Sequence, residues 1–159
     1  MSNFVKKYIY ILTLYITQCE YLMRTSQNAG LILMLDDEFD IVNIFSLALK
    51  REGFHVVAFT EPLLALEHFE KNSEKYCLVI SDIRMPIMDG YAFTKRVKEI
   101  KPNVKVFFMS AHLNDDIQFR TGLSLVKLEE YIEKPISIIE FIRLVKKYFP
   151  TAEISKKSN

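Results

Sequence analysis

The sequence predicts an α/β protein built on one parallel sheet, and two observations support this prediction. Two apolar runs, at residues 31–35 and 77–81, each end abruptly at a carboxylate, at Asp36 and at Asp82. Continuous apolar runs of this length are typical of strands that are buried on both faces. Segments with a helical period separate the predicted strands, and this alternation favours right-handed crossovers and a parallel sheet.

The first predicted helix covers residues 38–52 and ends before Gly53, which stands where a left-handed C-cap residue is expected. A short strand follows at 55–59. The next helix runs to about Lys71, with Thr60 as its cap and Pro62 in its first turn. The apolar positions that give the first helix its period are Ile41, Ile44, Phe45, Ala48 and Leu49.

After the strand that ends at Asp82, a helix is predicted over 90–101, and Pro102 stops it. Strand four is predicted at 104–109. The pattern of the segment 112–130 is weak, because Gly122 interrupts a polar, weakly periodic helix and residues 123–128 could be loop, turn or strand. A fifth strand is predicted at 129–133. The pattern Ser137-x-x-Glu140 is a capping box that opens a last helix with four inward side chains, namely Ile138, Phe141, Ile142 and Val145.

Composition fits one packed domain. The chain has 159 residues, and its content of 50% hydrophobic and 13% aromatic residues is sufficient for a single core. A formal net charge of +1, with no lysine-arginine stripe, argues against a nucleic-acid surface. The two cysteines are far apart and lack metal-ligand spacing, so a reducing, cytoplasmic setting is expected.

Four motifs in register resemble those of the receiver domain of two-component response regulators. They are LMLDDE, VISDIRMPIMDG, FFMSA and YIEKP, in that order, and the resemblance covers residues 29–149. The resemblance implies a flavodoxin-like (β/α)5 fold, which is a doubly wound, five-stranded parallel sheet with the strand order 2-1-3-4-5.

The resemblance also implies a phosphorylation site where the strands end. Asp82 would accept the phosphoryl group, Asp37 and Asp82 would ligate Mg²⁺, and Asp36 would act through a water. The backbone carbonyl of Arg84 would complete the protein ligands. Magnesium suits this chemistry, because it is a hard ion that takes one or two carboxylates with phosphate oxygens and water. The alternative for Asp36 and Asp37 is helix capping without a metal.

Three further residues match the contact and switch positions of receivers. Lys134 would reach the phosphoryl oxygens as a point charge. Ser110 would swing to hydrogen-bond a phosphoryl oxygen, and Tyr131 would change rotamer with it. The alternatives are a solvated lysine, an ordinary polar cap and half-buried strand packing, in that order.

The remaining positions of the motifs shape loops or tune kinetics. Pro86 and Gly90 would shape the loop after the acceptor, and the resemblance implies a cis peptide bond before Pro135. Arg84 and His112, each two residues after a site residue, would face the attacking water and tune the lifetime of the acyl phosphate.

We expect a single-domain response regulator that accepts a phosphoryl group from a sensor histidine kinase or a histidine phosphotransfer protein. The residues at 150–159 form a polar tail, so output would come from contact with a downstream protein or from onward phosphotransfer, without direct nucleic-acid binding. Its only catalysis would be its own phosphorylation and dephosphorylation. The alternatives are an unphosphorylated scaffold and a small-molecule phosphatase, which would place a second carboxylate where Arg84 stands.

Residues 1–28 form an apolar extension that the receiver does not need. The segment superficially resembles a signal peptide but lacks a small-residue cleavage site, and its apolar run is too short to span a bilayer. Its pattern suits a helix or a strand. It would pack on a partner, a second copy or a membrane surface through residues 4–23, unless translation begins at Met23.

Overall fold

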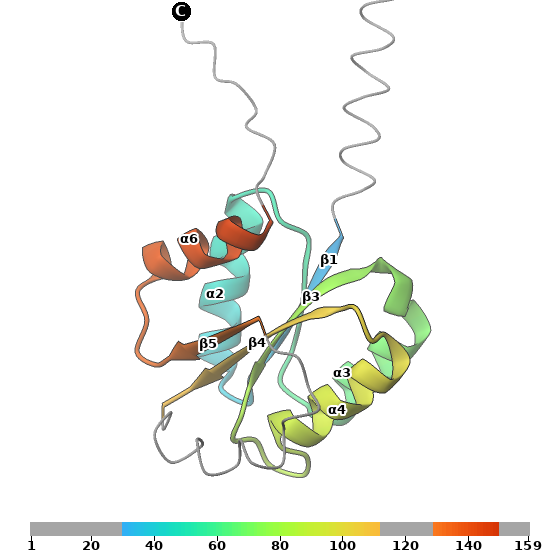
Figure 1. Cartoon of the computed structure of the whole chain (residues 1–159). Coiled ribbons are helices and arrows are strands. Elements are labelled where there is room, and N and C mark those ends of the chain that lie inside the picture. Colours follow the sequence, from blue (N-terminus) through green and yellow to red (C-terminus); the bar gives the residue numbers. More distant parts are fainter. Residues whose placement is uncertain (1–29, 112–128, 150–159) are drawn as a thin grey trace, which may run out of the picture. The chain divides into compact units, whose positions relative to one another are not determined.

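Five parallel strands form one sheet in the order β2-β1-β3-β4-β5 in the computed structural model of the chain (Figure 1). The structure describes residues 30–111 and 129–149. The observed order confirms the predicted fold class. The strands are β1 (Leu31–Leu35), β2 (Val56–Phe59), β3 (Tyr76–Asp82), β4 (Lys105–Ser110) and β5 (Glu130–Glu133).

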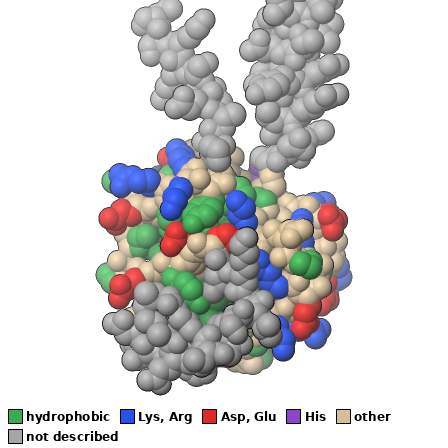
Figure 2. Space-filling model, in the orientation of Figure 1, with side chains coloured by type: hydrophobic (Ala, Val, Ile, Leu, Met, Phe, Trp, Pro, Cys, Tyr) green, Lys and Arg blue, Asp and Glu red, His purple; other side chains and the backbone are tan. Residues whose placement is uncertain are grey.

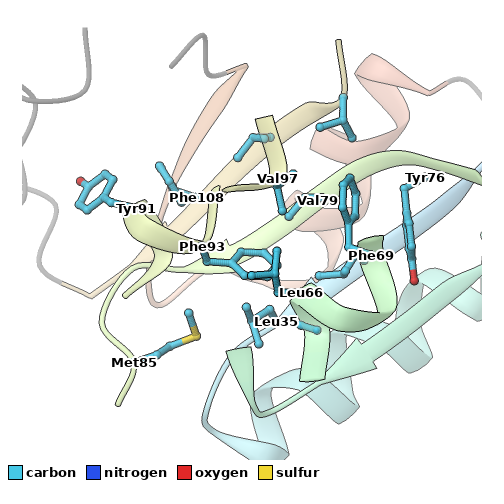
Figure 3. Close-up of a cluster of buried hydrophobic side chains, with 14 of the residues drawn as sticks. Leu35, Leu66, Phe69, Tyr76, Val79, Met85, Tyr91, Phe93, Val97 and Phe108 are labelled. Carbon is cyan, nitrogen blue, oxygen red and sulfur yellow. The ribbon is translucent and has the colours of Figure 1, made fainter. Parts of the chain in front are cut away.

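Helices cover both faces of the sheet (Figure 1). Neighbouring side chains of a strand point to opposite faces, so Leu33 of β1 joins one buried cluster and Met34 joins the other. The first cluster includes residues of α3 and α4 (Figure 3), and the second includes residues of α2 and α6. The helices are α2 (Phe39–Arg51), α3 (Pro62–Asn72), the short 3₁₀ helix η1 (Ser73–Lys75), α4 (Gly90–Ile100) and α6 (Ile138–Tyr148).

The end of α2 confirms the predicted glycine cap. Gly53 has a φ of 89°, and its N–H donates to the carbonyl of Lys50 at 3.1 Å. The N–H of Phe54 donates to the carbonyl of Leu49, also at 3.1 Å. These two bonds form a Schellman motif, which requires a left-handed residue that glycine adopts without a steric penalty.

The start of α3 corrects one expectation. The N-cap of α3 is Glu61, not Thr60, and no side chain caps the helix there. Because the ring of Pro62 crowds the residue before it, Glu61 is extended, with φ −117° and ψ 118°. The proline therefore fixes where the helix begins, and a cap one residue earlier is not formed.

Two predicted core residues are exposed. Ile44 of α2 and Ile138 of α6 face solvent, whereas Phe45 and Phe141 are buried and their ring centroids lie 4.5 Å apart. Ile44 lies beyond the arc of α2 that the sheet covers, and Ile138 is the first residue of α6. The spacing of apolar residues therefore predicted a wider buried face than either helix has.

Side chains cap α4 and α6, the helices that follow β3 and β5. Asp89 accepts the N–H of Ala92 at 2.7 Å and caps α4. The predicted capping box is confirmed, because Ser137 accepts the N–H of Glu140 at 3.2 Å and its hydroxyl donates to the Glu140 carboxylate at 2.7 Å. Both caps fix the chain that leaves a strand at its carboxyl end.

Several expectations fall outside the described residues. They concern the extension at 1–28, His112, most of the ambiguous segment 112–130, and the tail at 150–159. In the part of the chain that the structure describes, no helix is long and apolar enough to cross a membrane. On the face drawn in Figure 2, the coloured acidic and basic side chains are interspersed with separate hydrophobic patches.

Candidate functional site

The pairing of β1 with β3 places Asp36 beside Asp82. Leu35 pairs with Ser81 in the parallel register, so the next residue on each strand is an aspartate at the same level. Both aspartates are buried. The sequence predicted this convergence, because carboxyl ends of neighbouring parallel strands share one edge of a sheet.

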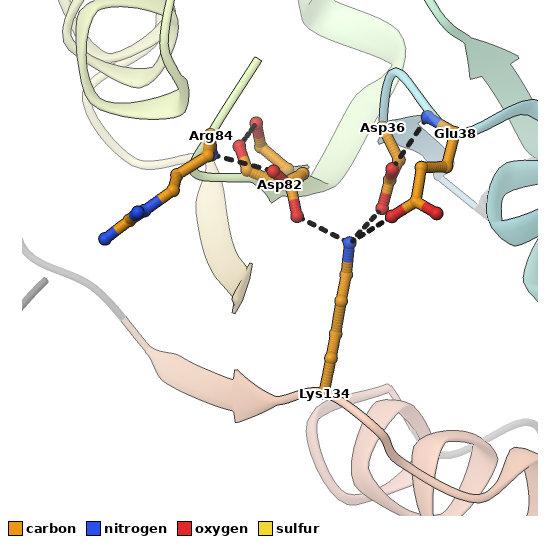
Figure 4. A network of polar contacts seen from close by, with 6 residues as sticks. Asp36, Glu38, Asp82, Arg84 and Lys134 are labelled. Atoms are coloured by element: carbon orange, nitrogen blue, oxygen red, sulfur yellow. Dashed lines mark hydrogen bonds and ion pairs between the residues drawn. The ribbon is translucent and has the colours of Figure 1, made fainter. Parts of the chain in front are cut away.

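Lys134, which directly follows the edge strand β5, contacts both of these carboxylates. Its backbone N–H donates to the Ser110 carbonyl at 2.8 Å, which continues the β4–β5 pairing, and the Lys134–Pro135 bond is cis, as the resemblance implied. Its Nζ lies 2.7 Å from Oδ2 of Asp36 and 2.5 Å from Oδ1 of Asp82 (Figure 4). One ammonium group therefore bridges carboxylates from two other strands.

The second oxygen of each aspartate accepts a backbone N–H. Oδ1 of Asp36 accepts the N–H of Glu38 at 3.0 Å, and Oδ2 of Asp82 accepts the N–H of Arg84 at 2.7 Å. In Figure 4 the exposed Arg84 side chain extends away from the ammonium of Lys134. Each carboxylate is thus fixed by a donor two residues ahead and by the same lysine.

Burial and charge together set the protonation of this cluster. Burial raises the pKa of Asp82 and the nearby charge of Asp36 adds to this, while the hydrogen bond from Lys134 opposes the rise in part. Burial would lower the pKa of Lys134, but its hydrogen bonds to the two carboxylates outweigh burial and raise the pKa overall. The lysine therefore stays cationic, and it partly offsets the like charges of the aspartates.

The loop after Asp82 closes tightly on the backbone of Asp82 itself. Gly90 donates its N–H to the carbonyl of Ile83 at 2.9 Å, and a β carbon at Gly90 would collide with the Asp82 carbonyl oxygen. The N–H of Met88 donates to the Pro86 carbonyl at 2.7 Å. Glycine is therefore the one residue type that fits at position 90 without moving Asp82.

Ser110 and Tyr131 lie on the two strands beyond Asp82. Met109 pairs with Asp82, so Ser110 follows one step beyond the aspartate on β4, and it is buried. Tyr131 of β5 is half-buried and packs on Phe108, with ring centroids 5.7 Å apart. These positions are compatible with the expected switch pair, whose movement stays a prediction.

The donor set fits a divalent cation in part. Within residues 30–111 and 129–149, no three His, Cys, Asp or Glu side chains gather as a metal-binding cluster. Asp37 is exposed and does not join the pair, so its role as a ligand stays a prediction. The pair itself suits Mg²⁺, because Asp36 and Asp82 bring hard carboxylate oxygens to one point and Mg²⁺ needs only one or two.

Ile87, in the same loop, is the site feature that the sequence analysis missed. It is exposed and has a φ of 71°, a left-handed conformation that a β-branched residue rarely adopts. Its position between Pro86 and the glycine at position 90, in a loop expected to turn tightly, could have indicated a positive φ. Its exposed side chain is apolar and lies in the loop that follows Asp82.

The buried carboxylate of Asp82 lies at the carboxyl edge of a doubly wound sheet and faces a fixed cation, an arrangement that suits the binding and transfer of an anionic group. The sequence matches the response regulator receiver domain over residues 32–146, and the chain therefore belongs to the response regulator receiver family. Receiver domains act in phosphorylation-based two-component signalling and interact with histidine kinases or phosphotransfer proteins.

Relatives of different architecture share this domain. Sporulation initiation phosphotransferase F of Bacillus subtilis (strain 168) is 33% identical over 120 residues, which are 75% of this chain and 93% of that protein. The DNA-binding transcriptional regulator NtrC of Proteus hauseri is 31% identical over 130 residues, which are 82% of this chain and 27% of that protein. The chain thus spans about a quarter of that regulator.

Solved receiver structures have the same fold. The receiver domain of the hybrid histidine kinase CckA matches with a TM-score of 0.60 and 28% identity, over 74% of this chain and 97% of that one. The chemotaxis response regulator CheY4 of Vibrio cholerae matches with a TM-score of 0.65 and 21% identity, over 74% and 97%. The second likeness supports the fold alone.

Proposed function

We propose that Asp82 is the phosphoacceptor of a receiver that takes its phosphoryl group from a phosphohistidine of a sensor kinase or phosphotransfer protein. The observation that carries this proposal is the placement of Asp82, buried at the edge of the sheet with its Oδ1 2.5 Å from the Lys134 ammonium. Similarity to a sporulation initiation phosphotransferase, which this chain covers almost end to end, supports a role in a relay.

Transfer forms a bond between a carboxylate oxygen of Asp82 and phosphorus and breaks the phosphorus–nitrogen bond of the donor. The histidine nitrogen keeps the electron pair of the broken bond and takes up a proton. Two anions must meet in this step, so fixed positive charge near Asp82 lowers the barrier. Lys134 supplies that charge in place, and the Arg84 N–H orients the acceptor carboxylate through its Oδ2.

Mg²⁺ is the proposed cofactor, with Asp36, Asp37, Asp82 and the carbonyl of Arg84 as the groups that would hold it. When bound, the ion supplies charge neutralisation for the phosphoryl oxygens. Mg²⁺ should raise the thermal stability of the protein, and Asp37→Ala should weaken this effect much more than the matched Glu38→Ala. Equal effects would mean that helix charge, not coordination, is being measured.

The output is proposed to pass through Ser110 and Tyr131 to a downstream protein. Three new phosphoryl oxygens need hydrogen-bond donors, which favours an inward arrangement of the buried Ser110 hydroxyl and of the half-buried tyrosine. Arg84 and His112 are proposed to tune the lifetime of the acyl phosphate, because each follows a site residue by two positions. The receiver domain would pass on its signal by contact with that protein or by onward phosphotransfer.

Incubation with acetyl phosphate and Mg²⁺ tests the acceptor directly. The wild-type chain should gain a base-labile phosphoryl group that Asp82→Asn does not gain, and Asp37→Asn should slow the labelling. Persistent labelling of the Asp82→Asn protein at another residue would overturn the assignment. A wild-type chain that is never labelled would favour the scaffold alternative.

A further inference from the structure

Charge is separated between the two ends of the sheet. The exposed acids at the carboxyl end, around Asp82, include Asp37, Glu38, Asp40, Glu61, Asp89 and Glu133. The helices run back against the strands and therefore end at the amino end of the sheet, and α2, α3, α4 and α6 each have a base in the last turn. Such bases stabilise a helix through its dipole. They also give the molecule one end that attracts anions.

The ends of α2 and α6 bring several of these bases together. Lys146 of α6 pairs at 2.6 Å with Glu52, which directly follows α2, so the two helix ends lie side by side. Lys50, Arg51 and Lys147 are exposed, and none of the three forms an ion pair with another described residue. The positive charge at this corner of the molecule is therefore free to attract an anionic partner.

An open hollow of about 450 Å³ adjoins these bases. It is lined by three apolar residues, two residues with basic side chains and a glycine, namely Leu31, Phe54, Val56, Lys50, His55 and Gly53. A β carbon at Gly53 would meet no atom within 4 Å, so the hollow is open beside the glycine. A hollow with both apolar and cationic walls suits a phospholipid, because a phosphate adjoins hydrocarbon in that molecule.

The segments that precede and follow the described fold are joined to it at this same end, where β1 begins and α6 ends (Figure 1). Residues 1–28, which precede β1, contain an apolar and aromatic run at 8–16 directly after Lys6 and Lys7. The tail at 150–159 contains two further lysines. An apolar run next to lysines is typical of segments that lie in the interface of a membrane.

We infer that the amino end of the sheet is a docking surface for an anionic lipid bilayer. Lys50, Arg51 and Lys147 attract the lipid phosphates, the hollow beside them receives a headgroup, and the run at 8–16 enters the interface. An acidic protein would account for the bases alone, whereas a bilayer accounts for the bases and for the apolar run. Asp82 lies at the opposite end of the sheet, so docking leaves it facing away from the membrane. The inference does not depend on phosphorylation of Asp82.

Sedimentation of the full chain with vesicles, without any phosphodonor, tests this inference. The chain should bind vesicles of an equal mixture of phosphatidylcholine and phosphatidylglycerol, and it should bind phosphatidylcholine alone much more weakly. Binding should fall as salt rises from about 0.1 M to about 1 M, because the Debye length shortens from about 10 Å to about 3 Å. The double variant Lys50→Gln, Arg51→Gln should bind the mixed vesicles roughly tenfold more weakly than the wild-type chain.

The matched control is the double variant Lys95→Gln, Arg96→Gln, which removes the same charge from exposed positions in the middle of α4. Its binding should change by less than roughly twofold, because these bases lie away from the docking surface. Urea denaturation should give both double variants the stability of the wild-type chain to within about 0.5 kcal/mol, since all four side chains are exposed. Weaker binding by the first variant then reflects lost contact with lipid.

The double variant Ile11→Asn, Leu14→Asn tests the apolar run without changing charge. It should also bind the mixed vesicles roughly tenfold more weakly, since it exposes less apolar surface to the interface. Equal binding of the wild-type chain to both kinds of vesicle would overturn the inference, as would equal losses in the α2 variant and the α4 control. Binding to polyglutamate but to neither kind of vesicle would identify an acidic protein as the partner and would likewise overturn it.

Discussion

Asp36 and Asp82 are held by the same arrangement on neighbouring strands. Each aspartate accepts a backbone N–H from two residues ahead with one oxygen, and each accepts the Lys134 ammonium with the other. Two like charges at this depth are stable together only if a cation stays between them. The stability of the site and its readiness for a metal or a phosphoryl group therefore depend on the same lysine.

Replacing Lys134 should expose this dependence. Lys134→Met leaves two facing carboxylates without their cation, and we expect a loss of about 3 kcal/mol in the free energy of unfolding, measured by urea denaturation at pH 7 without metal. The matched control is Lys146→Met, which breaks the pair with Glu52 at 2.6 Å. That pair has side chains 39% and 37% exposed, against 13% for Lys134, and its loss should cost less than about 1 kcal/mol. Equal losses would show that Lys134 acts as an ordinary surface lysine.

The stability of the metal-free protein should depend on the ionisation of Asp82. Burial raises the pKa of Asp82, so the folded state binds its proton more tightly than the unfolded chain does. The resulting stabilisation is complete below the unfolded pKa of about 3.9 and is lost as the pH rises through the folded pKa. Asp82→Asn should thus be more stable than wild type at pH 7, with a gap that closes towards pH 4 in paired urea titrations. A variant that is less stable at pH 7 would indicate a lowered pKa.

Gly90 and Gly53 offer a matched pair of alanine substitutions. A β carbon at Gly90 would collide with the Asp82 carbonyl, whereas Gly53 has open space but a φ of 89°. Gly53→Ala should cost about 1 kcal/mol of unfolding free energy and leave labelling by acetyl phosphate intact. Gly90→Ala should cost more than about 2 kcal/mol and slow labelling, because Asp82 has to move. Normal labelling of a folded Gly90→Ala protein would show that the loop adjusts without displacing the acceptor.

Ser110→Ala should leave phosphorylation intact but prevent the conformational change that phosphorylation causes in β5. The hydroxyl is buried one step beyond the acceptor on β4, where it can serve the phosphorylated state without taking part in transfer. The variant should be labelled by acetyl phosphate, but it should lose the chemical-shift changes in β5 that phosphorylation causes in the wild-type chain. Changes confined to the loop at 83–90 in the wild-type chain would argue against a switch at these positions.

The strand and helix boundaries could be predicted because they depend on neighbours along the chain. Apolar runs ending at Asp36 and Asp82, the glycine cap at position 53 and the Ser137 capping box all act within a few residues, and the structure contains each of them. The start of α3 was misplaced by one residue for an equally local reason, since the steric effect of Pro62 on Glu61 outweighs the capping preference of Thr60.

The sequence by itself determined which residues end the strands, because each strand end depends on the pattern of apolar residues and on the turn-forming residues next to it in the chain. Only the tertiary structure decided that Lys134 bridges Asp36 and Asp82, which precede it by 98 and 52 residues, because that contact depends on the register of separate strands. The raised pKa of Asp82 likewise depends on burial by segments far along the chain. The close approach of Gly90 to the carbonyl of Asp82 is likewise a contact in space, which forms because the loop between the two residues folds back.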